Sequence, residues 1–77
     1  MSTTQSYSNY YFKRTNEPNY KFIQWINEIE TIVFKEIGLK LLDLPDEPYM
    51  INFQDGLSPR EIAESIIKSS SYINYKN

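Results

Sequence analysis

Two residue types that carry much of enzyme chemistry are missing from this 77-residue chain, which has no cysteine and no histidine. Without them it cannot form a disulfide, a zinc site of the usual ligands, or a nucleophile–histidine relay. Its only glycines, Gly38 and Gly56, are too few for a phosphate-binding loop. The acidic residues do not follow the spacing of a calcium loop. We therefore expect no metal, no cofactor and no enzymatic activity.

Long apolar runs are absent as well. No stretch approaches the roughly 20 apolar residues that cross a bilayer. The first residues, MSTTQSYSNYYFKR, are polar and lack the apolar centre of a secretory signal peptide. We expect a cytoplasmic chain that does not engage a membrane.

The charge of the chain is unevenly distributed. Residues 28–64 hold nine acidic and three basic residues, a net of −6, whereas residues 1–27 hold three basic residues and one acidic residue, a net of +2. An acidic middle repels a phosphate backbone. This pattern argues against nucleic acid as the main partner.

The first expected helix covers about residues 19–37. Its apolar side chains recur at helical spacing, in a stripe formed by Phe22, Ile26, Ile29, Val33 and Ile37 that Trp25 and Ile32 widen. Gly38 then suits the left-handed C-cap. Further apolar residues lie off this stripe, so the helix can be buried on two sides, and a homodimer is one way to cover the second side.

A second helix is expected over about residues 46–55, after an apolar connector. Asp46 is a suitable N-cap, and Gly56 follows the expected end as a C-cap. Pro45 ends any helical continuation from the connector.

The third expected helix, about residues 58–70, has the clearest local signal in the chain. Ser58 is the N-cap, Pro59 occupies the first helical position, and Glu61 completes a capping box with Ser58. A run of serines at 69–71 weakens the helix there. Together the three helices predict an all-α fold, a small three-helix bundle with polar-aromatic tails at both ends.

The termini are expected to lie outside this bundle. The division is an arm of residues 1–15 that is flexible or partly ordered, a helical domain of residues 16–71, and a tail of residues 72–77. An edge strand formed by the arm and the tail segment SYINYKN is an alternative, and a peptide-like binding arm is another.

The N-terminal arm contains the residues predicted to bind a partner. They are Tyr7, Tyr10, Tyr11, Phe12, Lys13 and Arg14. Aromatic residues beside cations recur at interface hot spots. A bundle that begins near Asn19 does not need them, so their removal is expected to leave the fold intact.

The stretch from Trp25 to Ala63 resembles a group of short phage and bacterial proteins of unassigned function. The matching positions are Trp25, the segment Leu42-Asp43-Leu44-Pro45-Asp46, Tyr49, Phe53, Gly56, Ser58, Pro59, Glu61 and Ala63. The resemblance covers about half the chain and implies a compact helical fold without catalytic residues.

Two functions follow as hypotheses. The first is a non-enzymatic module that binds a larger protein, as a phage-type inhibitor or adaptor. The second is a small DNA-binding regulator, because helix 46–55, Gly56 and helix 58–70 are similar to a helix-turn-helix. The start of its recognition helix offers Arg60 against Glu61 and Glu64, which is poor chemistry for a DNA groove.

Overall fold

A computed structural model describes residues 5–76, with side chains through residue 70. It contains helices α1 (Tyr7–Arg14), α2 (Tyr20–Ile37), α3 (Tyr49–Gln54) and α4 (Pro59–Lys76), and a short 3-10 helix, η1 (Leu41–Asp43). These residues include no strand, so the predicted all-α class is confirmed. Four α-helices are present where three were expected. None of the described helices is long and apolar enough to cross a membrane.

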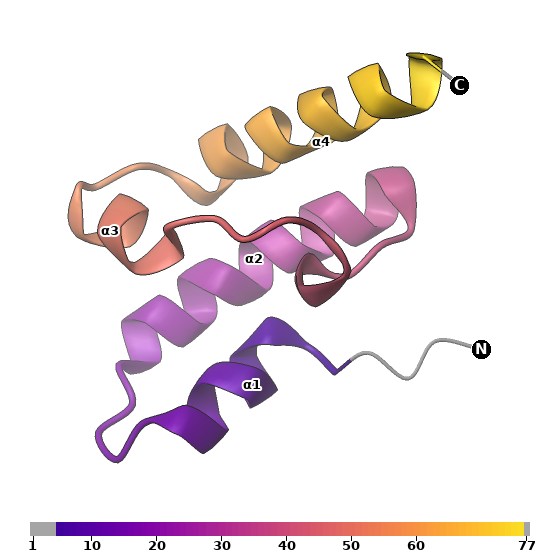
Figure 1. Ribbon diagram of the computed structural model, residues 1–77. Coiled ribbons are helices and arrows are strands. Elements are labelled where there is room, and N and C mark those ends of the chain that lie inside the picture. Colours follow the sequence, from indigo (N-terminus) through magenta and orange to yellow (C-terminus); the bar gives the residue numbers. More distant parts are fainter. Residues whose placement is uncertain (1–4, 77) are drawn as a thin grey trace.

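Helix α2 is the centre of the molecule, and α1 and α4 lie on either side of it in Figure 1. The Asn19 side chain caps its start by accepting a hydrogen bond from the Phe22 N–H at 3.0 Å. Gly38 ends it in the left-handed conformation, with φ of 72°, and donates its N–H to the Phe34 carbonyl at 2.8 Å. The sequence predicts both ends of this helix correctly.

Helix α4 begins with the reciprocal bonds of the predicted capping box. The Ser58 N–H donates to Glu61 Oε1 at 2.9 Å, and the Glu61 N–H donates to Ser58 Oγ at 3.1 Å. The serine run does not end this helix, which continues to Lys76. The expected end at about residue 70 was therefore wrong, and residues 71–76, expected to fray or to form a tail or an edge strand, continue the helix. Serine inside a helix costs only a few tenths of a kcal/mol relative to alanine, too little to stop it.

Helix α3 is shorter than predicted, and Asp46 does not cap it. The helix starts at Tyr49, with Pro48 in the N-cap position and no side-chain cap. Proline disfavours a helical conformation in the residue before it, so Glu47 is not helical and α3 begins after Pro48. The end of α3 agrees with the sequence. Gly56, at φ of 82°, donates to the Phe53 carbonyl at 3.1 Å, and Leu57 donates to the Asn52 carbonyl at 3.2 Å, which is a Schellman motif.

One core joins α2, η1, α3 and α4. Its buried side chains are Phe22, Trp25, Ile26, Ile29, Val33, Leu41, Tyr49, Ile62, Ala63 and Ile66. Trp25 also donates its indole N–H to the Leu57 carbonyl at 2.8 Å. This bond ties α2 to the turn between α3 and α4, so Trp25 both fills the core and fixes that turn.

The segment expected to be a flexible or partly ordered arm forms helix α1, and this is the main correction to the sequence prediction. Ser6 caps it, because its side-chain oxygen accepts from the Asn9 N–H at 3.3 Å. Lys13 and Arg14 occupy the last turn, where cations suit the helix dipole. Eight residues make a marginal helix in isolation, so contacts with α2 must stabilise it.

Candidate functional site

The inward side of α1 consists of Tyr7 and Tyr11, one helical turn apart. The Tyr7 ring meets the Tyr49 ring edge-on at 5.0 Å, and the Tyr11 ring lies 4.8 Å from the Phe22 ring. The Tyr11 hydroxyl also accepts a hydrogen bond from the Asn19 N–H at 3.0 Å. Both tyrosines therefore hold α1 against the body of the molecule. Of the six predicted partner-binding residues, these two contribute mainly to the fold.

A buried carboxylate anchors the start of α1. Glu30 on α2 is buried, and its Oε1 accepts from the Tyr7 N–H at 3.1 Å. Its Oε2 accepts from the Leu41 N–H at 2.8 Å. Hydrogen bonds from backbone N–H groups to a charged acceptor are stronger than neutral ones. Glu30 thus joins the first residue of α1 and the first residue of η1 to the same point on α2.

Of the other four predicted residues, Phe12, Lys13 and Arg14 are exposed, and Tyr10 is half-buried with its ring 5.5 Å from the Tyr7 ring. The Arg14 guanidinium lies over the Tyr10 ring, 4.6 Å from its centroid, one turn along the helix. A shallow hollow of about 310 Å³ lies among Gln5, Tyr10, Lys13 and Arg14. Aromatic and cationic groups are therefore side by side on this surface.

Tyr20, at the start of α2, adds a second exposed ring beside Phe12. Its ring lies edge-on to the Phe12 ring, with centroids 6.1 Å apart and planes at 77°. Phe12 is 48% exposed and Tyr20 is 64% exposed, so the ring pair is largely open to solvent. We call Tyr10, Phe12, Lys13, Arg14 and Tyr20 the outer α1 surface.

The sequence placed Tyr20 in a helix but not among the binding residues. The sequence position of Tyr20 is what could have identified it as exposed, because Tyr20 precedes the apolar stripe that begins at Phe22 and lies off that stripe. Without the helix of residues 7–14, nothing in the sequence shows that Phe12 and Tyr20 meet.

The cations of the outer α1 surface are available to a partner. Among the described side chains, the one ion pair within 4.0 Å joins Arg60 and Glu64, at 3.9 Å. Lys13 and Arg14 are both exposed and belong to the net-positive part of the chain. A partner that meets this surface can therefore pair its acidic groups with them.

Two tyrosine hydroxyls of the described residues have a raised pKa. The Tyr49 hydroxyl is buried without a hydrogen-bond partner. Burial raises the pKa of Tyr49, and the neighbouring carboxylate of Glu47 raises it further. Burial likewise raises the pKa of Tyr7. Both phenols therefore stay neutral at physiological pH. No cluster of three or more potential metal ligands occurs among the residues that the structure describes.

Comparison of the chain with protein families, curated proteins and solved structures finds no match.

Proposed function

We propose that this protein is a non-enzymatic interaction module that binds a larger protein through the outer α1 surface. The observation that carries the proposal is the exposed edge-to-face pair of Phe12 and Tyr20, with the exposed cations Lys13 and Arg14 following Phe12 along α1. Two large rings held in one geometry offer a wide apolar contact for little loss of side-chain entropy. Rings and arginine are the side chains that most often dominate binding energy at protein interfaces.

The rest of the molecule acts as a scaffold for that surface. Helices α2, α3 and α4 contribute to one core, and α1 is fixed to it by Tyr7, Tyr11 and Glu30. Because Phe12, Lys13, Arg14 and Tyr20 are exposed and are not part of the core, a partner can contact them without rearrangement of the core. In this proposal the module acts in the cytoplasm, as an inhibitor or adaptor of phage or bacterial type.

The chemistry of the surface also indicates the kind of partner. Lys13 and Arg14 favour a partner with acidic groups around an apolar patch that receives Phe12 and Tyr20. The acidic residues 28–64 would repel such a partner elsewhere on the molecule. Charge therefore orients the complex in addition to contributing affinity.

The test compares how much partner protein the wild type and two matched variants capture. The wild type, a Phe12→Ser/Tyr20→Ser variant and an Ile51→Ser variant are immobilised and exposed to bacterial lysate. Ile51, on α3, is 60% exposed, so it controls for loss of an exposed apolar side chain away from α1. We expect a protein that the wild type and Ile51→Ser retain and the double variant does not. With the purified partner, the double variant should bind about 30-fold more weakly or worse.

Two results would contradict the proposal. One is equal capture by all three proteins. The other is a partner that binds wild type and double variant with the same dissociation constant. Analytical ultracentrifugation tests the homodimer alternative. In that case the mass of the wild type, measured without a partner, increases with concentration, and the Phe12→Ser/Tyr20→Ser variant does not show this increase.

A DNA-binding regulator is the alternative function. The same cations and rings could contact phosphates and stacked bases. At the start of α4, however, the single cation Arg60 pairs with Glu64, which leaves no free cation there to read a groove. A duplex-DNA mobility shift at about 50 mM salt that is lost by about 200 mM salt would favour this alternative. The absence of any shift would favour the protein-binding module.

A further inference from the structure

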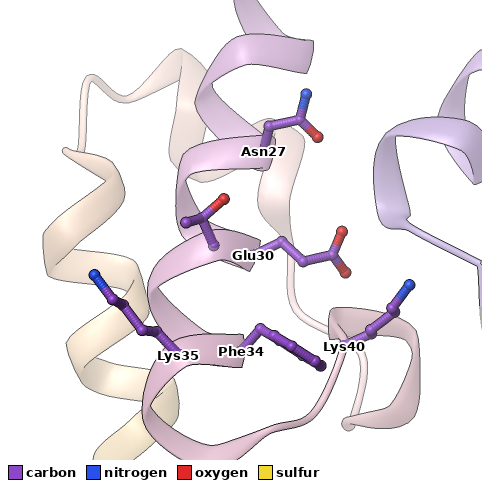
Figure 2. A pocket seen from close by; sticks show the side chains of 6 residues that line it. Asn27, Glu30, Phe34, Lys35 and Lys40 are labelled. Atoms are coloured by element: carbon purple, nitrogen blue, oxygen red, sulfur yellow. The ribbon is translucent and has the colours of Figure 1, made fainter.

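A second surface, apart from α1, has the features of a peptide-binding groove. It runs along the later half of α2, with a volume of about 550 Å³ (Figure 2). Its lining consists of Asn27, Glu30, Thr31, Phe34 and Lys35 from α2, together with Lys40 after the Gly38 turn. Phe34 is 52% exposed, so the groove contains a large apolar side chain that the core does not use.

The groove contains two lysines, Lys35 and Lys40, from the most acidic part of the chain. Residues 28–64 carry three basic residues, Lys35, Lys40 and Arg60. Arg60 is paired with Glu64, whereas neither lysine has an ion pair within 4.0 Å among the described side chains. Figure 2 shows the two lysines on either side of Phe34. Lys35 also suits the negative end of α2, but Lys40 lies outside that helix and has no such role.

The buried carboxylate at the groove does not cancel this charge. Both oxygens of Glu30 already accept backbone hydrogen bonds, from Tyr7 and from Leu41. Two lysines against this one carboxylate leave the six lining residues with a net charge of +1. Asn27 and Thr31 stand one helical turn apart on its wall and offer an amide and a hydroxyl to a peptide backbone.

We propose that this groove binds a short acidic peptide segment of a partner protein that carries one aromatic or aliphatic side chain. The apolar side chain packs on Phe34, and acidic groups on either side of it pair with Lys35 and Lys40. A second copy of this chain fits less well, because a face-to-face arrangement would oppose the same lysines. This binding is separate from that of the outer α1 surface, so either proposal can fail without the other.

The experiment is a selection of random 12-residue peptides displayed on phage against the immobilised wild type. We expect enriched sequences that combine aspartate or glutamate with a phenylalanine, tryptophan or leucine. A fluorescein-labelled synthetic copy of an enriched peptide then measures affinity by anisotropy. Phe34→Ser and Lys35→Gln/Lys40→Gln should each weaken binding by about tenfold or more, and added salt should weaken the wild type further.

The Phe12→Ser/Tyr20→Ser variant is the matched control, because it removes exposed rings from the other surface. It should bind the selected peptide with unchanged affinity. Circular dichroism checks that each variant is folded, which the exposure of Phe34 leads us to expect. Four results overturn the proposal: no enrichment, enrichment of basic or uncharged sequences, peptide binding that survives Phe34→Ser, or a dimer in solution that Phe34→Ser disrupts.

Discussion

The two sides of α2 are closed by different interactions. On the α4 side, Ile62, Ala63 and Ile66 are buried in an aliphatic contact. On the α1 side, none of the described residues of α1 is buried, and the helix is held by ring edges and by bonds to Glu30 and Asn19. Apolar burial contributes about 25 cal/mol per Å², whereas one hydrogen bond contributes about 1 kcal/mol net. The α4 side should therefore dominate the stability of the fold.

This difference matters for function because α1 carries the proposed binding surface. A helix held by a few specific contacts can present side chains outward without exposing the core. The α4 side has no comparable set of exposed rings and cations among its described side chains. If this difference is real, substitutions on the α4 side should change stability most.

Trp25→Ala should lower the free energy of unfolding by about 3–5 kcal/mol, because it empties part of the core and removes the bond to the Leu57 carbonyl. Urea denaturation measures the loss, and native tryptophan fluorescence in the wild type should be blue-shifted relative to the unfolded chain. Ile51→Ala, at an exposed site, should change stability by less than about 0.5 kcal/mol. If Trp25→Ala lowers the free energy of unfolding by less than Glu30→Gln does, the α4 side does not dominate the stability of the fold.

Glu30→Gln should lower the free energy of unfolding by about 1–3 kcal/mol. Glutamine keeps the size of the side chain but has a single acceptor oxygen, so one of the two backbone N–H groups loses its partner. Glu28→Gln is the matched control, because Glu28 is exposed on the same helix. Equal melting curves for these two variants would show that Glu30 does not anchor α1.

Ser58→Ala should cost about 1 kcal/mol, because the Glu61 N–H at the start of α4 loses its acceptor. Thermal melts measure this loss against Ser65→Ala, which changes an exposed serine inside the same helix and should be neutral or slightly stabilising. Identical melting temperatures for the two variants would show that the capping box does not stabilise α4.

Tyr49→Phe should leave stability unchanged at neutral pH, or raise it by up to about 1 kcal/mol. The Tyr49 side chain is 4% exposed, and its buried hydroxyl has no partner, so its loss sacrifices no hydrogen bond and removes a desolvated polar group. Urea denaturation at pH 7 gives the comparison. A clear destabilisation would mean that the hydroxyl does have a partner in solution.

At alkaline pH, the difference in the free energy of unfolding between the wild type and Tyr49→Phe should increase. Folding raises the pKa of Tyr49 above its ordinary value of 10.0, so the folded state keeps a proton that the unfolded chain loses. The stability of the wild type is therefore fully present below pH 10 and falls as the pH rises above it, by up to about 1.4 kcal/mol per pH unit for one group. The Tyr49→Phe variant should fall less steeply. Parallel curves would contradict the raised pKa.

The sequence predicts best where local chemistry alone decides the structure. Asn19, Gly38, Ser58 and Glu61 act on residues three or four positions away, and their roles are readable without tertiary contacts. The Asp46 prediction failed for an equally local reason, because the effect of Pro48 on the residue before it outweighs a good N-cap.

Helix α1 and the outer α1 surface depend on distant residues, and sequence patterns do not show them. Tyr7 and Tyr11 have helical spacing, but two turns are too short for a period to stand out, and tyrosine favours strands as readily. What stabilises the helix is Glu30, 23 positions from Tyr7. The meeting of Phe12 with Tyr20 follows only once α1 has folded back on α2.

Amide hydrogen exchange of α1 tests the central claim most directly, namely that α1 is folded against α2 and holds the outer α1 surface in place. We predict that the amides from Tyr10 to Arg14 exchange at least about tenfold more slowly than in an unstructured peptide. In Glu30→Gln this protection should fall while that of α2 and α4 persists. Exchange of these amides at unstructured rates in the wild type, with α2 protected, would contradict the account.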